Sequence, residues 1–283
     1  MNNSIIPQIL KGKVGCIRMS IQRVHSKQAK TDALLADHAL RAFVPDTRPF
    51  SEHNVREMLQ QYGMIYVKPI KGTFGNGVIR IEHTTHESQP YRFQSGERIY
   101  RFDTLESMYD KLLTVKRSRP YLAQQGIHLL TYKKRRFDLR VMVQMSPTGK
   151  WETTGMIGRL GHPRKIVTNY HSGGTPLPVE RLLDPTLTED EIRSLKARLR
   201  EHGMNVAAAL ARRYPRIKEI GIDIALDDQL KPWILEVNTL PDVYLFRKLP
   251  NRSAFRRMYA YAIAYGRYTA GSRRSLRKMK RRA

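Results

Sequence analysis

Cysteine, long apolar runs and repeats are scarce or missing in this chain of 283 residues. Cys16 is the only cysteine, which excludes an intrachain disulfide framework and suits a reducing compartment. No apolar run approaches the roughly 20 residues that a membrane helix needs, and the N-terminus lacks the apolar stretch of a signal peptide. We therefore expect a cytoplasmic protein, folded as one compact unit of two subdomains.

Acidic residues are missing from the end of the chain. After Asp242 the remaining 41 residues contain 13 Lys or Arg and no acid, in a chain of formal net charge +26. Residues 246–270 are expected to form an amphipathic helix, either docked on the domain or used for recognition. Residues 271–283 are expected to be a disordered basic arm that attracts a polyanion, such as nucleic acid, a cell-wall polymer or an anionic surface.

Capping residues and apolar spacing predict the other elements. The expected helices are 31–42, one that begins after Ser51 as N-cap, 104–115 and 188–213. Strands are expected to dominate 64–102 and 121–167. The basic run Lys133-Lys134-Arg135-Arg136 is expected in a loop, either simply solvated or adding positive potential to a nearby site.

Three polar residues stand in a pair of apolar segments near the C-terminus, in GIDIALDDQLKPWILEVN (221–238). Residues 220–226 and 233–238 have the composition of strands, with turn formers between them. Side chains alternate along a strand, so Glu236 and Asn238 point to one face. If Pro232 closes the turn, Leu226 pairs with Trp233, and Asp223 lies opposite Glu236.

Asp223, Glu236 and Asn238 would then present hard oxygen ligands on one patch. Such a patch suits Mg²⁺ held between carboxylates and phosphates. The alternative is a solvated face of a hairpin. Because apolar residues run through both strands, burial of three polar groups on one face needs a reason, and metal ligation is favoured.

A glycine-rich loop lies upstream, in VKPIKGTFGNGV (67–78). Backbone N–H groups of such a loop can approach phosphate oxygens, and the adjacent Lys68 adds charge. The loop joins two apolar strands and contains no Gly-Lys-Ser/Thr before a helix, which excludes the P-loop and the dinucleotide fingerprint. A tight turn at Asn76-Gly77 is the alternative. Together with the acidic hairpin, the loop favours a site for a nucleotide and Mg²⁺.

In this order the motifs resemble the ATP-grasp superfamily, and within it the YheC/YheD group of endospore coat-associated proteins. The resemblance covers roughly residues 27–245. The chain is also similar to ligases that add glutamate to protein C-termini. The spacing of its Asp223, Glu236 and Asn238 recurs in D-alanine–D-alanine ligases. The match is carried by VKPIKGTFGNGV (67–78), YLAQQGI (121–127), FDLRV (137–141), GRLG (158–161), TNYHSGG (168–174) and the D-x₁₂-E-x-N run that ends at Asn238.

The resemblance implies an α+β fold in which two α+β subdomains, with mostly antiparallel sheets, grip ATP. Residues 27–245 would form this ATP-grasp domain. Relatives carry a separate α/β domain before it, whereas residues 1–26, with a strand-like 14–19, are only a fragment. That domain is expected to be reduced, absent or replaced by a partner. A spore-associated location also follows from the resemblance.

The resemblance also implies roles for individual residues. ATP would be bound by Lys30 (or the nearby Lys27), Lys68, Gly72, Gly75, Gly77, Gln124, Gln125 and Ile127. One or two Mg²⁺ ions, or Mn²⁺ in their place, would be held by Asp223, Glu236 and Asn238. The γ-phosphate and the acceptor would be faced by Arg140, Arg159 and Asn169, the last in an Asn-x-x-x-Gly-Gly loop with Gly173 and Gly174.

The implied chemistry is ATP-dependent activation of a carboxylate as an acyl-phosphate, which an amine or thiol then attacks. The protein would position reactants and neutralise charge. His171 would either orient the amine or make local hydrogen bonds. Ser172 stands where the glutamate-adding ligases have Arg, which disfavours an acidic acceptor. The alternatives are an ATP-binding coat protein without turnover and a nucleic-acid-binding protein that acts through the basic arm.

Overall fold

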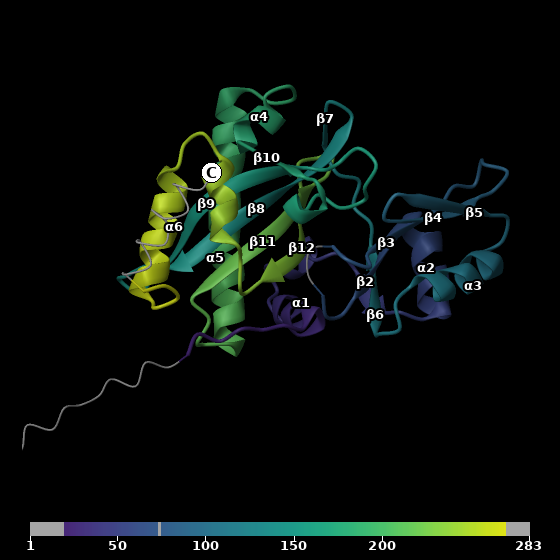
Figure 1. Cartoon of the computed structure of the whole chain (residues 1–283), viewed down its shortest axis with the longest axis horizontal. Helices are drawn as coiled ribbons and strands as arrows, with labels where there is room; N and C mark the ends of the chain where they lie inside the picture. Colours follow the sequence, from purple (N-terminus) through teal and green to yellow (C-terminus); the bar gives the residue numbers. More distant parts are fainter. Residues whose placement is uncertain (1–19, 73–74, 270–283) are drawn as a thin grey trace, which may run out of the picture.

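The computed structural model describes residues 20–72 and 75–269 (Figure 1). The strand-like segment 14–19, the basic arm 271–283 and two residues of the glycine-rich loop lie outside these residues. The described part contains two units side by side, each an antiparallel sheet with helices packed on it. This arrangement confirms the α+β prediction.

The first unit contains one sheet, whose strand order is β1-β6-β2-β3-β4-β5 and whose neighbours are all antiparallel. Its strands are β1 (Thr47–Pro49), β2 (Met64–Pro69), β3 (Ile79–His83), β4 (Tyr91–Ser95), β5 (Arg98–Phe102) and β6 (Tyr121–Gln125). Two helices, α2 (Glu52–Tyr62) and α3 (Leu105–Val115), share an apolar core with it. Because side chains alternate along β2, Ile65 and Val67 enter that core, while Tyr66 and Lys68 face the opposite side.

The second unit contains one sheet, whose strand order is β10-β9-β8-β11-β12, and β7 pairs with β8. Its strands are β7 (Thr131–Tyr132), β8 (Arg135–Met145), β9 (Trp151–Leu160), β10 (Thr175–Leu177), β11 (Glu219–Leu226) and β12 (Pro232–Asn238). Its helices are α1 (Lys27–Leu35), α4 (Val179–Leu183), α5 (Glu189–Arg213) and α6 (Ser253–Ala264). Short 3₁₀ turns η1 (Arg41–Phe43), η2 (Tyr170–Ser172) and η3 (Val243–Lys248) connect them.

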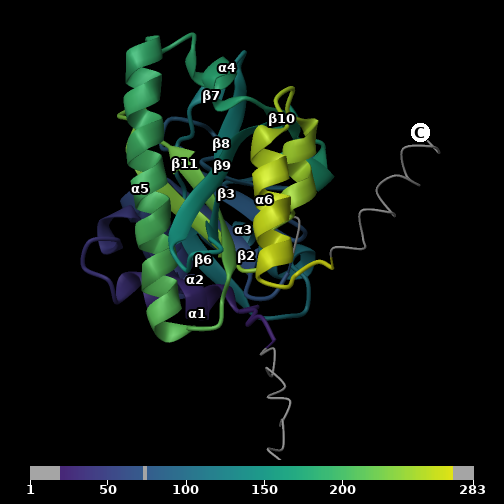
Figure 2. The same cartoon turned by 90° about the vertical axis from the view of Figure 1, so that its left-hand side faces the viewer.

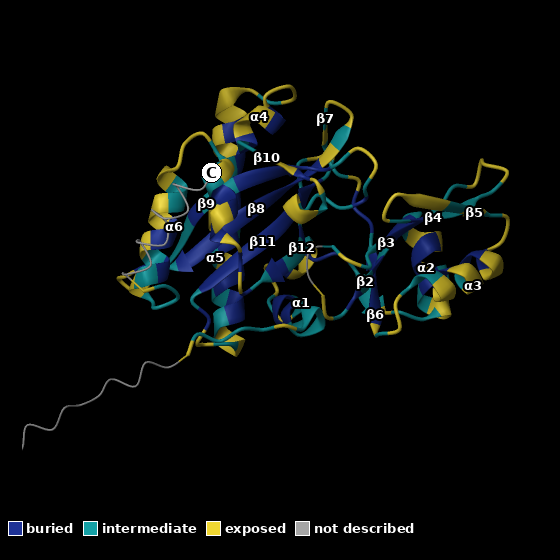
Figure 3. Cartoon of the chain, viewed as in Figure 1, coloured by how far each residue is buried: buried dark blue, intermediate teal, exposed yellow. Residues whose placement is uncertain are grey.

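Helices cover both faces of the second sheet. In Figure 2, α5 lies against one face and α6 against the other. The α5 face holds the larger core, and the α6 face holds a smaller one around Met142, Ile157 and Met258. A Cβ atom on Gly155 would lie 2.3 Å from Cε of Met258, so glycine lets α6 approach β9 closely. Figure 3 shows the buried interior of this sheet. The helix expected over residues 246–270 is shorter, because α6 spans Ser253–Ala264 and η3 takes Val243–Lys248.

Helix starts follow the capping residues. Ser51 Oγ accepts a hydrogen bond from Asn54 N at 3.2 Å, and Thr188 and Glu191 form a capping box at the start of α5. These predictions are confirmed. None of the helices in the described ranges is long and apolar enough to cross a membrane.

The first predicted helix, 31–42, is wrong at both ends, because α1 spans Lys27–Leu35. Ser26 caps it earlier than expected. The Asp37 carboxylate accepts hydrogen bonds from Ala39 N and Leu40 N, which offers the backbone a turn in place of further helix.

The basic run is only partly a loop. Lys133 and Lys134 form the turn between β7 and β8, with φ of 50° and 61°, whereas Arg135 and Arg136 belong to β8. Positive φ at two successive residues is the geometry of a tight hairpin turn. The strand assignment gives the two arginines fixed directions, and Arg136 lines the central cavity.

A β-bulge corrects the predicted register of the acidic hairpin. Leu226 pairs with Pro232, not with Trp233, yet Asp223 does pair with Glu236. Asp223 pairs with Glu236 and the next residue, Ile224, pairs with Ile234, so Leu235 is an extra, unpaired residue in β12. A one-residue shift of this kind exchanges the two faces of a strand. Ile234 and Val237 therefore both reach the core although they are three residues apart, and Glu236 stays on the face of Asp223.

Candidate functional site

A cavity of about 630 Å³ lies between the two units and extends over the α6 side of the second sheet. It collects residues from both sheets, the segment before α1, and the chain after β12. Almost every residue predicted for the site lines it: Lys30, Lys68, Gly72, Gly75, Gln124, Gln125, Ile127, Arg140, Arg159, Asn169, Asp223, Glu236 and Asn238. Gly77 is the exception; a Cβ atom there would lie 3.0 Å from Tyr121 Oη, beside the sheet.

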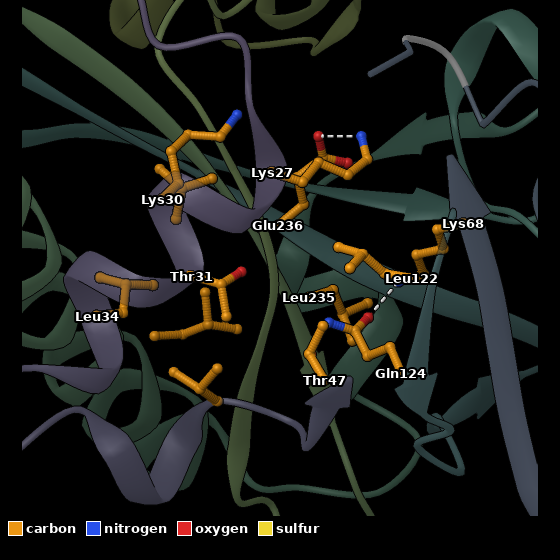
Figure 4. A pocket seen from close by; sticks show the side chains of 13 residues that line it. Lys27, Lys30, Thr31, Leu34, Thr47, Lys68, Leu122, Gln124, Leu235 and Glu236 are labelled. Atoms are coloured by element: carbon orange, nitrogen blue, oxygen red, sulfur yellow. Dashed lines mark hydrogen bonds and ion pairs between the residues drawn. The ribbon is translucent and has the colours of Figure 1, made fainter. Parts of the chain in front are cut away.

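Lys68 projects from β2 into the cavity next to Gln124 of β6, and the Lys68 ammonium donates a hydrogen bond to the Gln124 amide oxygen (Figure 4). Gln124 in turn donates from Nε2 to Thr47 Oγ1 at 3.1 Å. Burial lowers the pKa of Lys68 to about 8, although Glu236 and Asp223 oppose the shift. A phosphate group beside this ammonium would favour its charged form and so oppose the effect of burial.

Lys27 and Lys30 both reach the cavity from the first turns of α1. Lys30 is buried, and burial lowers its pKa more than the nearby Glu236 raises it. Lys27 Nζ lies 2.7 Å from Glu236 Oε1 (Figure 4). The same ammonium lies 3.3 Å from the Gly72 carbonyl oxygen. Lys27 therefore links the acidic hairpin to the glycine-rich loop, while Lys30 lies deeper.

Arginines and carboxylates alternate across the cavity floor formed by β9, β8 and β11. Arg140 Nε donates to Asp223 Oδ1 at 2.5 Å, and Arg159 Nη2 lies 2.8 Å from Asp223 Oδ2. Arg159 also makes two hydrogen bonds to Asp138. Gly221 makes room for this row, since a Cβ atom on it would lie 3.1 Å from Cδ of Arg140.

Neighbouring charges set the pKa values of Asp223 and Arg159 in this row, which consists of Arg140, Asp223, Arg159 and Asp138. Burial raises the pKa of Asp223, but the charges of Arg140 and Arg159 outweigh burial and lower that pKa to about 2. Burial lowers the pKa of Arg159, and Asp138 and Asp223 reverse that effect and raise it above its usual value. Asp223 and Arg159 therefore stay charged at neutral pH. Asp138 stands in the motif FDLRV two residues before Arg140, so strand alternation, the one signal for it in the sequence, places it on the same face.

The predicted metal ligands are adjacent on β11 and β12 and have suitable donors. In addition to its arginine contacts, each Asp223 oxygen keeps a second lone pair, and Asn238 Oδ1 accepts one hydrogen bond, from Leu240 N at 2.9 Å. Glu236 attracts the Lys27 ammonium, which shows that a cation is stable there. Within residues 20–72 and 75–269 no cluster of three His, Cys, Asp or Glu side chains suits a metal; this set relies on an asparagine. Two carboxylates and an amide fit a hard divalent cation.

The two glycine-bearing loops meet at the mouth of the cavity. A Cβ atom on Gly75 would lie 3.1 Å from Asn169 Oδ1, so the glycine-rich loop closely approaches the Asn169–Gly174 loop. In the latter, Gly173 has φ of 88°, and Gly174 N donates to Asn169 O at 3.1 Å. Only glycine fits at 174, where a Cβ atom would lie 2.0 Å from the Thr168 carbonyl oxygen.

Sequence reasoning missed the far end of the cavity. Glu219, at the start of β11, is fully buried and accepts hydrogen bonds from Tyr265 Oη at 2.7 Å and Arg267 Nη1 at 2.8 Å. Arg23 Nη1 lies 2.8 Å from its other oxygen. Arg23 and Arg267 both line the cavity, with Tyr244 and Tyr268. No local motif could have revealed this cluster, since its members are spread over almost the whole described chain.

Comparisons with known proteins agree with one another. A model of the family described as YheC/D-like ATP-grasp matches residues 17–269. The endospore coat-associated protein YheD of Bacillus subtilis (strain 168) is 25% identical over 231 residues, covering 74% of this chain and 48% of that protein. The endospore coat-associated protein YheC of the same organism is 22% identical over 204 residues, covering 71% and 56%. The chain spans about half the length of the curated relatives it matches.

Among solved structures, N5-carboxyaminoimidazole ribonucleotide synthetase from Thermotoga maritima is similar with a TM-score of 0.46 and 11% identity. The match covers 86% of this chain and 48% of that one.

Proposed function

The chain belongs to the YheC/D-like ATP-grasp family, and from this premise we propose that it is an ATP- and Mg²⁺-dependent ligase that joins a carboxylate to an amine or thiol. One observation carries the proposal. Lys68, the polar face of the acidic hairpin and the pair Arg140–Arg159 converge on a single cavity, although they come from both sheets. Such a convergence of cations and hard oxygen ligands suits a polyphosphate bound with a divalent ion.

ATP-grasp proteins bind ATP and a divalent metal in general. Here Asp223, Glu236 and Asn238 would hold Mg²⁺, with Mn²⁺ as an alternative ion of similar preference for oxygen. When bound, the ion would neutralise phosphate charge and orient the γ-phosphate for in-line attack. The Lys27 ammonium, which lies at Glu236, would then turn to the phosphates or to the Gly72 carbonyl.

The chain's own residues position the reactants and stabilise charge. Lys68 donates from its ammonium to phosphate oxygens, which exchanges its contact with Gln124 for one with an anion. Arg140 and Arg159 are held in fixed directions by Asp223 and Asp138, so their remaining N–H groups are preorganised for the negative charge of the transferring phosphoryl group. The carboxylate oxygen attacks the γ-phosphorus, ADP leaves, and an acyl-phosphate forms.

The second half-reaction needs an amine or thiol beside the acyl-phosphate. The Asn169–Gly174 loop closes over this side of the cavity, and Asn169 approaches the glycine-rich loop. The Asn169 side chain would orient the nucleophile, and phosphate would leave as the new C–N or C–S bond forms. His171 also lines the cavity, where it would either orient the nucleophile or make local hydrogen bonds.

Thermal melting with and without ATP and Mg²⁺ tests the nucleotide site. At 100 times its dissociation constant, a ligand adds about 2.7 kcal/mol, or about 5–10 °C in a domain of this size. We expect Glu236→Ala to lose the Mg²⁺-dependent part of this shift. Asp228→Ala removes an exposed acid from the turn of the same hairpin and should keep the full shift. No shift in the wild type would overturn the proposal.

Hydroxylamine tests the ligase step. It is a small amine that converts an acyl-phosphate to a hydroxamate, so the wild type with ATP, Mg²⁺ and a panel of carboxylates should release ADP and form hydroxamate. ADP release without hydroxamate, from every carboxylate, would contradict the acyl-phosphate route.

A second candidate is an ATP-binding role in the endospore coat without turnover. It is favoured by the names of the two curated relatives, both endospore coat-associated proteins. Repeated turnover of ATP by the purified chain would exclude it. ATP binding without turnover, under conditions that include the carboxylate panel, would favour it over the ligase.

A further inference from the structure

The cavity continues beyond the metal-binding hairpin into a second region, which we call the acceptor end. It begins where the chain leaves β12 at Asn238, and it is walled by residues 239–245, by residues 23–25 and by the chain after α6. Val24 N donates to Thr239 Oγ1 at 2.8 Å, which joins two of these walls. The acceptor end therefore adjoins Asn238, one of the three residues proposed to hold Mg²⁺.

Exposed apolar side chains gather at this end. Among the described residues, five large hydrophobic side chains are exposed, and three of them line the cavity: Leu240 and Tyr244 at the acceptor end, and Tyr170 in the Asn169–Gly174 loop. Leu240 is 51% exposed. Exposed apolar groups that collect in a concave site mark ligand contacts more often than scattered ones do.

Aromatic packing holds this wall in place. The Tyr244 ring centre lies 6.2 Å from that of Tyr268, which stacks on Tyr259 at 5.1 Å. The guanidinium of Arg267 lies 5.1 Å from the Tyr268 ring centre and is fixed by buried Glu219. A wall with side chains so constrained is preorganised, and it loses little conformational entropy when a ligand binds.

Charge distinguishes the two ends of the cavity. The nucleotide end is lined by six basic side chains (Lys27, Lys30, Lys68, Arg136, Arg140, Arg159) and three acidic ones (Asp138, Asp223, Glu236). At the acceptor end the charged lining residues are Arg23, Arg267 and Asp242, and both arginines are paired with the buried carboxylate of Glu219 behind the lining. Lys248 lies outside the lining, over the Tyr170 ring.

We infer that the acceptor end binds the body of the substrate carboxylate, and that this body is uncharged and aromatic or bulky and apolar. The inference rests on the proposed function for the reactive carboxyl group, which must reach Arg140 and Arg159. A second carboxylate or phosphate on the substrate would meet Asp242 and two arginines that Glu219 already pairs, whereas a ring would meet Tyr244, Tyr268 and Leu240.

Binding of three carboxylates to the full chain tests this inference. The probes are 3-phenylpropanoate, propanoate and succinate, titrated by calorimetry with Mg²⁺ and a non-hydrolysable ATP analogue present, and again without them. We expect 3-phenylpropanoate to bind at least about tenfold more tightly than either other probe, since it buries a ring that they lack. Equal binding of the three, or a preference for succinate, would overturn the inference.

Variants of the lining residues test whether the ring of 3-phenylpropanoate binds at the acceptor end. Leu240→Asp should reduce it at least about fivefold, since an acid would then face the ring, while Leu113→Asp, an equally exposed leucine on α3, should leave it unchanged. Tyr244→Ala should act like Leu240→Asp, and Tyr244→Phe should not. An undiminished preference in Leu240→Asp and Tyr244→Ala would place the ring elsewhere and refute the site. If nucleotide fails to bind, the proposed function fails, and the titration without nucleotide still decides the inference.

Discussion

Two buried carboxylates on one strand, Asp223 and Glu219, are each held by two arginines. They lie four residues apart on β11, so they share a face of the sheet. The partners of Asp223 are Arg140 and Arg159, on strands β8 and β9 of the same sheet. The partners of Glu219 are Arg23 and Arg267, from the two ends of the described chain.

The difference shows how one arrangement serves two purposes. Asp223 pairs with Arg140 and Arg159 at the cavity floor, where the proposed function places a phosphoryl group, and it remains 8% exposed. Glu219 has no exposure at all, and it fastens the segments before α1 and after α6 to the sheet. We therefore expect Asp223 to affect ligand binding and acid stability, and Glu219 to affect mainly the integrity of the acceptor end.

The largest effect is expected from Glu219→Ala. It leaves two guanidinium groups without their carboxylate, and breaking a buried ion pair costs about 3–5 kcal/mol. The melting temperature should fall by about 10 °C, as differential scanning calorimetry would measure. Glu219→Gln keeps hydrogen-bond acceptors and should lose less. A Glu219→Ala variant as stable as the wild type would show that the chain ends are held by other contacts.

Asp223→Asn should separate the two carboxylates by function. Because it removes a ligand charge without changing volume, we expect loss of the Mg²⁺-dependent part of ATP stabilisation, about 2–3 kcal/mol. Glu219→Gln should keep that part. Melting of both variants with ATP, with and without Mg²⁺, makes the comparison. Equal losses in the two would mean that the metal site depends on the whole of β11.

Acid should weaken the Asp223 row in a defined interval of pH. The folded pKa of Asp223, about 2, lies below its usual value of 3.8. Its ionised form therefore contributes stability fully above about pH 5, and the contribution, on the order of 2 kcal/mol, is lost as the pH falls from about 4 to 2. Urea unfolding of wild type and Asp223→Asn from pH 6 to 2 should show their difference shrinking toward acid. A constant difference would exclude this linkage.

The smallest effect concerns Lys68 and pH. Since the pKa of Lys68 is about 8 and ATP would bind the ammonium form, ATP affinity should be constant below pH 8. Above pH 8 it should fall by up to about tenfold per unit. Calorimetric titration of ATP from pH 7 to 9.5 measures this. Lys68→Arg stays charged throughout and should remove the alkaline fall, whereas a persistent fall would assign it to another group.

Much of the nucleotide end could be predicted because its motifs are contiguous. The alternation of strands places Glu236 with Asn238, and Asp138 with Arg140, from sequence spacing alone. The pairing of Asp223 with Glu236 was predicted from a register that proved wrong next to the turn, and the bulge at Leu235 restored it. Local patterns therefore indicated the site, although they gave no sign of the bulge.

The acceptor end could not be predicted, and the reason is physical. The sequence by itself determined the alternating strands, the helix caps, the glycine-rich loop and the chemistry of the metal-ligand set, all of which depend on residues close together in the chain. Only the tertiary structure decided that Arg23, Glu219 and Arg267 meet, and that Tyr244 and Tyr268 share a wall. Contacts between distant segments depend on how whole sheets and helices pack, and no local spacing encodes that packing.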